Sequence, residues 1–487
     1  MNSSGRPHNR YKPNTGISFI RTSLLCLLLV FIIAITPVQA ATTEDMYIYE
    51  SNNFSENNQP ENGTSSSYFS GVFITEKNHD NTSVRWICEK SEGGKSYENT
   101  FTITYLHNNS GEEHRISSSD IKIENISDIT LYSADIPAYP GSHISGELMQ
   151  GSAVLQPFSF QIPDINSGFE FVVLSDTHSS PENCGCIIPE TPAITTITDC
   201  INSNDSPDIT IISGDLVHDG YNIQHWKDFF TRSSSLLNKT MLFTTPGNHE
   251  KNSTYYYDIF GYPQFYSVDA GGCRFVFLDS NDYAAVSFPE QKKLIESVNE
   301  ETGMQQNPQM NFFFFHHPPY SSDERHPGGW KNIHKAWGES FEKTENSVVF
   351  SGHVHAYERF ETGNVTYIVC GTGGGELYHL GVYPDKEDAP VKSIEGKYGY
   401  MKIIVAPGGK SAEISFVTPT PADYHSNVTG DMPEDYTDNQ KNRIIPEVSD
   451  CSVAGDYYAY KRFLENIMII REDYSFLQFT EDNRVMI

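Results

Sequence analysis

Two hydrophobic patterns divide the chain. From about residue 67 to 165, short runs alternate apolar and polar residues and are separated by turn residues. This alternation is typical of half-buried antiparallel strands, and it predicts a small all-β sandwich. From about residue 168 to 420, the pattern becomes an apolar strand, a loop and a helix, repeated. The second region is therefore predicted to be an α/β domain.

Five apolar runs in the second region each lead into residues that can bind metal. Runs that are apolar throughout are typical of strands buried on both faces, and sites in α/β sheets form beyond the carboxyl ends of such strands. The side chains that follow the five runs are, in order, Asp176 and His178, Asp215, Asn248 and His249, His316 and His317, and His353 and His355.

Each of these residues has a structural explanation when it is taken alone. Asp215 could cap a helix, Asn248 could occupy the turn after Gly247, and a His-x-His pair often lies on a surface loop. Strand geometry would point His353 and His355 in one direction, since side chains two apart share a face. Five strands that deliver Asp, Asn and His to one edge favour a metal site over five separate structural roles.

Mixed oxygen and nitrogen ligands suit Mn, Fe, Zn or Co rather than a calcium cage. Nine side chains follow the five runs, and even seven of them are too many ligands for one ion. Seven are enough for two ions that share a carboxylate. Two ions can activate a bridging hydroxide as the nucleophile and clamp the attacking and departing oxygens of an in-line displacement. The pattern therefore predicts phosphoester hydrolysis.

The ordered motifs resemble those of the calcineurin-like metallophosphoesterases. Asp-x-His, Gly-Asp, Gly-Asn-His-Glu, His-x-Pro and Gly-His-x-His follow one another within residues 168–410. The segments at 316–321, 352–359 and 371–374 are similar to those of the purple acid phosphatase branch. The resemblance implies a four-layer α/β/β/α catalytic domain at 168–420 behind a fibronectin-III-like sandwich at 67–165.

The resemblance also implies a role for each site residue. The first metal would be held by Asp176, His178 and His355, and the second by Asn248, His316 and His353, with Asp215 as the bridge. His316 is preferred to His317 because Pro318 fixes the His-x-Pro register. His249 would face the leaving group as a catalytic acid, and Asp219 would be its partner unless it is a solvated loop residue.

Two departures from the purple enzymes concern the metal. His218 stands where those enzymes have a tyrosine that binds ferric iron, and the first motif is Asp-x-His instead of Asp-x-Gly. Both changes favour two divalent ions (Mn, Fe, Zn or a mixture), with His178 in place of the lost ligand. We expect the protein to be colourless.

The first 40 residues are typical of a signal peptide. Positive residues precede a run of 12 apolar residues, 24–35, and then Val38-Gln39-Ala40. A spanning helix needs about 20 apolar residues, so cleavage near Ala41 is predicted, with a retained N-terminal anchor as the alternative. The protein is therefore predicted to be secreted or at the cell surface. Residues 41–66 are predicted to be a linker, and 421–487 a C-terminal extension without an assigned role.

The composition excludes some partners. The formal charge is −30, and it becomes −34 without residues 1–40, which carry four positive and no negative charges. Such a chain is not expected to bind nucleic acid or an anionic membrane. Sequons at Asn62, Asn81, Asn125, Asn364 and Asn427 suit an exported glycoprotein. Eight cysteines leave disulfide pairing open, and Cys184 and Cys186 form only a weak zinc pattern.

The sequence thus predicts a secreted phosphohydrolase that acts on a small phosphorylated substrate, with a phosphomonoesterase (acid phosphatase-like) favoured. The alternatives are a phosphodiesterase or nucleotide pyrophosphatase on the same metal centre, and a non-enzymatic surface protein on a phosphatase scaffold. The oligomeric state and the substrate stay open.

Overall fold

The computed structural model describes ten segments of the chain, all within one compact unit, Ile48–Ile487. The predicted signal peptide and linker, and all but four residues of the predicted C-terminal extension, lie outside them. The described residues are 72–78, 81–89, 101–108, 111–181, 185–188, 191–298, 308–381, 389–419, 478–479 and 485–486.

The N-terminal region is all-β, as predicted, and its strands pair antiparallel in two sets. The first set has the order β1-β2-β6-β5, with bounds Val72–Asn78, Asn81–Glu89, Ile129–Pro137 and Lys122–Ile126. The second has the order β4-β3-β7-β8, with bounds Glu113–Ile116, Phe101–His107, His143–Gln150 and Ala153–Gln161. Phe101 of β3 packs edge-on against Trp86 and Tyr132 of the first set. These contacts join the two sets through a shared core.

The second region contains two further sets of strands, most of them buried. One has the order β23-β24-β22-β21-β9-β12-β13, with bounds Gln478–Phe479, Val485–Met486, Ala412–Val417, Tyr400–Val405, Phe169–Leu174, Ile209–Ser213 and Met241–Thr245. The other has the order β14-β15-β16-β17-β19-β18-β20, with bounds Tyr266–Ala270, Cys273–Phe277, Met310–Phe314, Ser347–Ser351, Val365–Cys370, Tyr357–Thr362 and Lys392–Ile394. A short hairpin joins β10 (Cys186–Ile188) to β11 (Thr191–Pro192).

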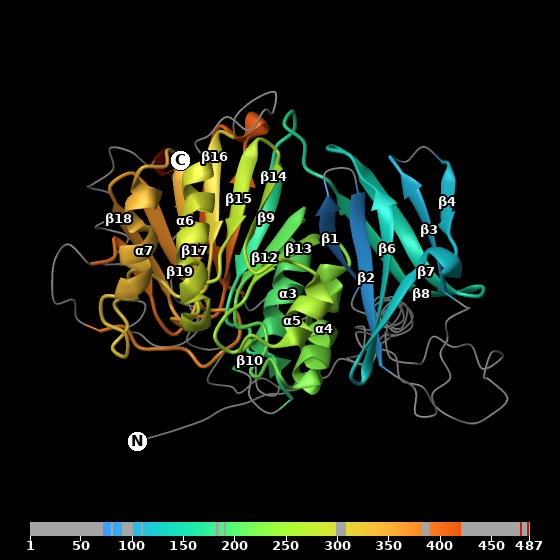
Figure 1. Cartoon of the computed structure of the whole chain (residues 1–487), viewed down its shortest axis with the longest axis horizontal. Helices are drawn as coiled ribbons and strands as arrows, with labels where there is room; N and C mark the ends of the chain where they lie inside the picture. Colours follow the sequence, from blue (N-terminus) through green and yellow to red (C-terminus); the bar gives the residue numbers. More distant parts are fainter. Residues whose placement is uncertain are drawn as a thin grey trace, which may run out of the picture. The chain divides into compact units, whose positions relative to one another are not determined.

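Helices accompany both sheets of the second region. Figure 1 shows α3, α4 and α5 as a group near β12 and β13, and α6 and α7 beside β16 to β19. Their bounds are Ala193–Asn204, Ile223–Leu237, Thr254–Phe260, Phe288–Ser297 and Lys331–Glu342, and the 3₁₀ turns η2, η3 and η5 span Ser118–Asp120, Asp282–Ser287 and Pro407–Gly409. Among the described residues, no helix is both long enough and apolar enough to cross a membrane.

The phenylalanine run of β16 explains how the layers pack. Phe312 and Phe314 belong to the core between the two sheets, where Phe312 lies 5.1 Å from Phe171 of β9, measured between ring centroids. Phe313 and Phe315 point to the opposite face and pack against α7, where both meet Phe341. Both faces of this strand are buried, which is why its sequence does not alternate. The predicted α/β fold class is confirmed.

The first N-terminal set continues the sheet of the second region. Ile74 of β1 pairs in parallel with Met241 of β13, so the two sets form one sheet of eleven strands. The guanidinium of Arg85 donates to the Ile259 carbonyl at 2.6 Å, and Phe73 stacks on Phe230 of α4. The N-terminal strands therefore cover what would otherwise be the open edge of β13.

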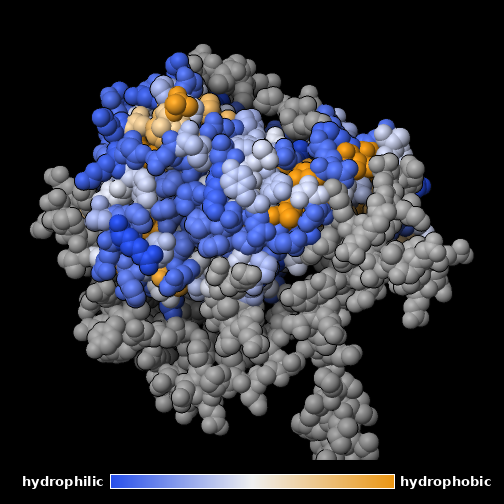
Figure 2. All heavy atoms as spheres, turned by 60° about the horizontal axis from the view of Figure 1, so that its bottom comes forward, coloured by the Kyte–Doolittle hydropathy of each residue, from blue (hydrophilic) through white to orange (hydrophobic). Residues whose placement is uncertain are grey.

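Polar residues dominate the face of the molecule that Figure 2 shows. The face in Figure 2 is largely hydrophilic, and its hydrophobic residues lie in small separate groups. Cys88, Cys273 and Cys370 are buried free thiols, and Cys200 is also buried. Cys184, and the side chain of Cys186, lie outside the described part of the chain, so the weak zinc pattern stays a prediction.

Candidate metal centre

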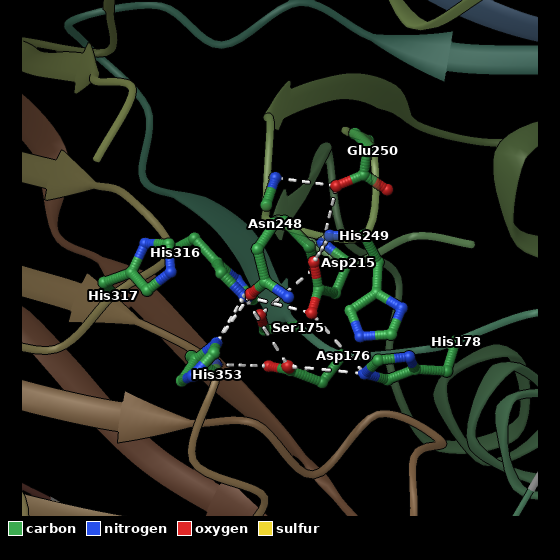
Figure 3. A network of polar contacts seen from close by, with 12 residues as sticks. Ser175, Asp176, His178, Asp215, Asn248, His249, Glu250, His316, His317 and His353 are labelled. Carbon is green, nitrogen blue, oxygen red and sulfur yellow. Dashed lines mark hydrogen bonds and ion pairs between the residues drawn. The ribbon is translucent and has the colours of Figure 1, made fainter. Parts of the chain in front are cut away.

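Loops that follow five parallel strands carry the predicted ligands. The strands β9, β12 and β13 are parallel neighbours in one sheet, and β16 and β17 are parallel neighbours in the other. The loop after β9 carries Asp176 and His178, and the loops after the others carry Asp215, Asn248, His316, and the pair His353 and His355. The structure brings these side chains together between the ends of the two sheets, as Figure 3 shows for most of them.

Unusual backbone geometry turns these side chains inward. Asp176, His178, Asp215 and His353 have φ values of 57°, 45°, 52° and 65°. This left-handed region is uncommon outside glycine, and it concentrates at functional sites, where the surrounding structure offsets a cost of about 1–3 kcal/mol each. The strained loops are also tightly packed, since a Cβ on Gly352 would overlap the side chains of Ser175 and Asp176.

The first group of donor atoms belongs to Asp176, His178 and His355. The Nε2 atoms of the two histidines lie 3.2 Å apart. The Asp176 Oδ1 atom lies 3.2 Å from Nε2 of His355 and 3.7 Å from Nε2 of His178. That oxygen is buried and has no hydrogen-bond partner. A buried carboxylate oxygen without a partner is costly, so its position between two imidazole nitrogens fits a metal ion.

The second group belongs to Asn248, His316 and His353. The Asn248 Oδ1 atom lies 3.0 Å from Nε2 of His316 and 2.7 Å from Nδ1 of His353, and the two nitrogens are 3.1 Å apart. An amide oxygen and two imidazole nitrogens are donors that Mn, Fe and Zn accept.

Asp215 lies between the two groups. Its Oδ2 atom is 3.6 Å from Nε2 of His178 in the first group and 3.1 Å from Nε2 of His316 in the second. Its Oδ1 atom accepts the His249 N–H at 2.7 Å. The donor set therefore fits two ions that share the Asp215 carboxylate.

Main-chain carbonyls orient two of the imidazoles. His316 Nδ1 lies 3.0 Å from the Ser213 carbonyl, and His355 Nδ1 lies 2.6 Å from the Glu376 carbonyl. Each contact places the proton on Nδ1 and leaves Nε2 free as a ligand, which is the usual second contact of a metal-binding histidine.

Charge inside the cluster shifts its titration. Burial by itself would raise the pKa of Asp176, but the charge of His316 and the nearby imidazoles of His178 and His355 lower it well below its usual range. Burial likewise opposes protonation of His316, yet the carboxylates of Asp215 and Asp176 raise its pKa. Without an ion, a proton on His316 therefore balances part of the carboxylate charge.

The two histidines of the last motif do not share a direction, contrary to the expectation from strand geometry. His353 contacts Asn248 and His316, whereas His355 contacts Asp176 and His178. The strand β17 ends at Ser351, and the left-handed φ of His353 reverses the chain direction locally. The expectation that side chains two apart share a face holds within a strand, and it therefore does not apply to His353 and His355.

The structure separates the two residues predicted for acid–base work. His249 lies beside the first group, with its ring centroid 4.4 Å from that of His178, and its Nδ1 bonds to the His218 carbonyl at 2.6 Å. Asp219 is half-exposed, and its carboxylate pairs with Lys251 at 2.9 Å. Both side chains therefore contact other partners, and the predicted pairing of Asp219 with His249 is not seen.

Sequence reasoning missed several residues beside the centre. The ring of Trp330 lies 4.3 Å from that of His353, and His326 stacks on Trp330 at 4.5 Å. Tyr378 stacks on His355 at 4.2 Å. None of these follows directly on one of the five apolar runs, so the pattern that predicted the ligands does not reach them.

Glu250 was also missed, although it ends the Gly-Asn-His-Glu motif. Its buried carboxylate accepts the N–H groups of Asp215 at 2.8 Å, Leu216 at 2.9 Å and Gly247 at 2.6 Å. It ties the loops after β12 and β13 together (Figure 3). Burial and the nearby Asp215 carboxylate both raise its pKa.

Comparison with known proteins agrees with this geometry. Residues 169–357 match the family model of the calcineurin-like phosphoesterases. The chain is 25% identical over 281 residues to purple acid phosphatase 22 of Arabidopsis thaliana, covering 52% of this chain and 61% of that protein. It is 23% identical over 274 residues to purple acid phosphatase 21 of the same plant, covering 50% and 59%. It thus spans about three fifths of the length of these relatives.

A solved structure shares the fold. The purple acid phosphatase PPD1 from yellow lupin seeds aligns with a TM-score of 0.56 at 15% identity, over 73% of this chain and 72% of that one. The predicted resemblance to the calcineurin-like phosphoesterases and their purple acid phosphatase branch is confirmed.

Proposed function

We propose that this chain, whose residues 169–357 match the calcineurin-like phosphoesterases, hydrolyses phosphate esters at a centre of two divalent metal ions. One observation carries the proposal: two groups of three donor atoms lie on either side of the Asp215 carboxylate. No predicted ligand position lacks a donor, which argues against a non-enzymatic scaffold.

The protein residues would divide the work. Asp176, His178 and His355 would hold one ion, Asn248, His316 and His353 the other, and Asp215 both. Two ions would polarise a water molecule and offset the charge of the phosphoryl oxygens. His249 would donate a proton to the leaving group through its free Nε2, since its Nδ1 is held by the His218 carbonyl.

A small phosphomonoester is the proposed substrate, and the protein is proposed to act after export. The relatives named above are phosphatases, which supports a monoester over a diester. The pKa of His249 is lowered, mainly by burial. Its protonated form is therefore present only on the acidic side, which supports acid phosphatase-like behaviour.

The test is a direct assay of residues 41–487. Bound metals are measured by elemental analysis, and an aryl phosphate monoester and diester are assayed side by side. We expect about two ions per chain and faster monoester turnover. His316→Ala should lose metal and activity, while His114→Ala, a histidine of β4 outside the centre, should keep both. Dominant diester turnover would favour the phosphodiesterase alternative, and metal-free, inactive protein would favour the scaffold.

A further inference from the structure

The loop of residues 320–330, here called the 320s loop, lies against the second group of donor atoms. Its last residue, Trp330, packs on His353, and its His326 lies 5.2 Å from His353, measured between ring centroids. His326 is half-buried, whereas the ligand candidates His316 and His355 are buried. The His326 ring thus lies beside His353 and is partly open to solvent.

Glu358 fixes the start of this loop. It lies in β18, three residues after His355, and is completely buried. Its Oε2 atom accepts the Ser321 hydroxyl at 2.9 Å, and its Oε1 atom accepts the Ser322 N–H at 3.0 Å and the Ser322 hydroxyl. All these donors come from two consecutive residues of the 320s loop.

A chain of hydrogen bonds leads from Glu358 to His326. The Ser321 hydroxyl, which donates to Glu358, accepts the Asp323 N–H at 3.0 Å. The buried carboxylate of Asp323 then accepts the Arg325 N–H at 3.2 Å and the His326 Nδ1–H at 2.8 Å. This chain holds the His326 ring through its Nδ1 atom.

Burial of Glu358 needs a reason beyond packing. A buried carboxyl is costly unless it is hydrogen-bonded, and an apolar residue would fill the same space at lower cost. The carboxyl is not a member of either donor group, and its hydrogen bonds go to the 320s loop. Its effect on the reaction would therefore pass through the loop.

We propose that Glu358 is a positioning residue that holds the 320s loop in place and thereby fixes His326 beside the second metal position. The kinetic measurements rest on the proposed phosphoesterase function. The hydrogen-exchange measurement of the loop does not depend on that function.

The first experiment compares Glu358→Gln with Glu147→Gln, an exposed glutamate of β7. Glutamine has the shape of glutamate, but the nitrogen of its amide group cannot accept a hydrogen bond. The hydrogen bonds that one of the two Glu358 oxygens accepts from Ser321 or Ser322 are therefore lost. We expect Glu358→Gln to raise KM and lower kcat/KM about 10-fold or more, with metal content unchanged. Hydrogen exchange should accelerate in residues 320–330 and stay unchanged in the loops after β9, β12 and β13. Glu147→Gln should behave as wild type.

The second experiment tests whether Glu358 acts through His326. If it does, the double variant Glu358→Gln/His326→Ala should lose no more kcat/KM than His326→Ala alone. A merely structural glutamate would instead give losses that multiply. Ser322→Ala, which removes one donor, should show a smaller loss than Glu358→Gln in the same direction.

The outcomes separate the two proposals. Normal loop exchange with normal kinetics in Glu358→Gln, or multiplying losses in the double variant, would overturn the positioning role. So would faster exchange throughout β18 and β19 with metal loss. If wild type hydrolyses no phosphate ester, the proposed function fails, and loop exchange alone decides whether Glu358 holds the loop.

Discussion

At the scale of single residues, Asp215 has the greatest expected effect. It contacts both donor groups, and its other oxygen holds the His249 main chain. We expect Asp215→Asn to lower turnover more than any single histidine replacement, by about 10²-fold or more, because two-ion clamping contributes several kcal/mol. Turnover and elemental analysis on the same samples measure this. Two retained ions with near-normal turnover would rule out the bridging role.

His249 allows a sharper test, because its proposed task depends on the leaving group. His249→Ala should lower turnover of alkyl phosphates by about 10²–10⁴-fold, the usual contribution of general acid catalysis. The loss should shrink for aryl phosphates, whose leaving groups depart as stable anions. Because the pKa of His249 is lowered, the wild-type advantage on alkyl phosphates should decline as pH rises through that pKa. A loss independent of the leaving group, or depleted metal, would remove His249 from the catalytic residues.

Asp219 now carries the opposite expectation. Its half-exposed ion pair with Lys251 is of a kind worth about 0–1 kcal/mol. Asp219→Asn should therefore change turnover and melting temperature very little, in contrast to Asp215→Asn. A loss comparable to that of His249→Ala would show that Asp219 has a part in the reaction although its carboxylate pairs with Lys251.

These residues also mark how far the sequence could predict the site. The ligand positions were predictable because each follows an apolar run, and parallel strands bring their ends together. The orientation of His353 and His355 was not, because it depends on a left-handed residue beyond the strand end. The partner of His249 was not either, since a main-chain carbonyl leaves no mark in the sequence.

At the scale of elements, the contact between β18 and the 320s loop makes a prediction about pH. Burial raises the pKa of Glu358 to about 7, against the opposing effect of hydrogen bonds from Ser322 and Ser321. A carboxyl with a raised pKa stabilises the fold below its unfolded pKa of about 4.3, and this contribution is lost as pH rises toward 7.

The measurement is the free energy of unfolding of wild type and Glu358→Gln across this range. Wild type should lose about 3 kcal/mol relative to the variant between pH 4.5 and 7, by the rule of 1.36 kcal/mol per pKa unit. The curve for Glu147→Gln, which removes an exposed carboxylate of β7, should run parallel to that of wild type. Curves for wild type and Glu358→Gln that stay parallel would show that Glu358 is already ionised in the folded protein at low pH.

The same elements show a limit of pattern reasoning. The strand β16 was predictable from its apolar run, and the parity of Phe312 and Phe314 places His316 on the inner face. The link from Glu358 to Ser321 and Ser322 joins residues 36 and 37 positions apart. The apolar and polar pattern around these residues does not indicate that they meet, so the contact is evident only from the folded structure.

At the scale of the molecule, the N-terminal strands and the α/β region depend on each other. The pairing of β1 with β13, the stacking of Phe73 on Phe230, and the contact of Arg85 with Ile259 all cross the boundary predicted near residue 166. A chain that begins at residue 168 would expose the edge of β13 and the face of Phe230, and exposed edges promote aggregation.

We therefore expect the chain that begins at residue 168 to be largely insoluble, or to melt well below the chain of residues 41–487. A chain that begins at residue 67 should behave as residues 41–487 do. Soluble yield and melting temperature measure the difference. A soluble, active protein from residue 168 onward would show that the α/β region folds independently.

The metal ions should stabilise the whole molecule as well as support the reaction. The donors Asp176, His178, Asp215 and Asn248 belong to loops of one sheet, and His316, His353 and His355 to loops of the other. Ions held between them would connect the two layers. A ligand that binds only the folded protein and is present at 100 times its Kd raises the free energy of unfolding by about 2.7 kcal/mol. Chelation should therefore lower the melting temperature by a few degrees, and added Mn²⁺ or Zn²⁺ should restore it.

The size of that effect should depend on pH, because ions and protons compete for the same donors. In the metal-free protein, the carboxylates of Asp215 and Asp176 outweigh burial and raise the pKa of His316, so this imidazole holds a proton that the ion must displace. Metal affinity should thus increase with pH, and the gap in melting temperature between the metal-loaded and chelated protein should widen from pH 5 to pH 8. In His316→Ala the gap should be small at every pH. A gap in wild type that is constant across this range would show that His316 releases no proton when the ions bind.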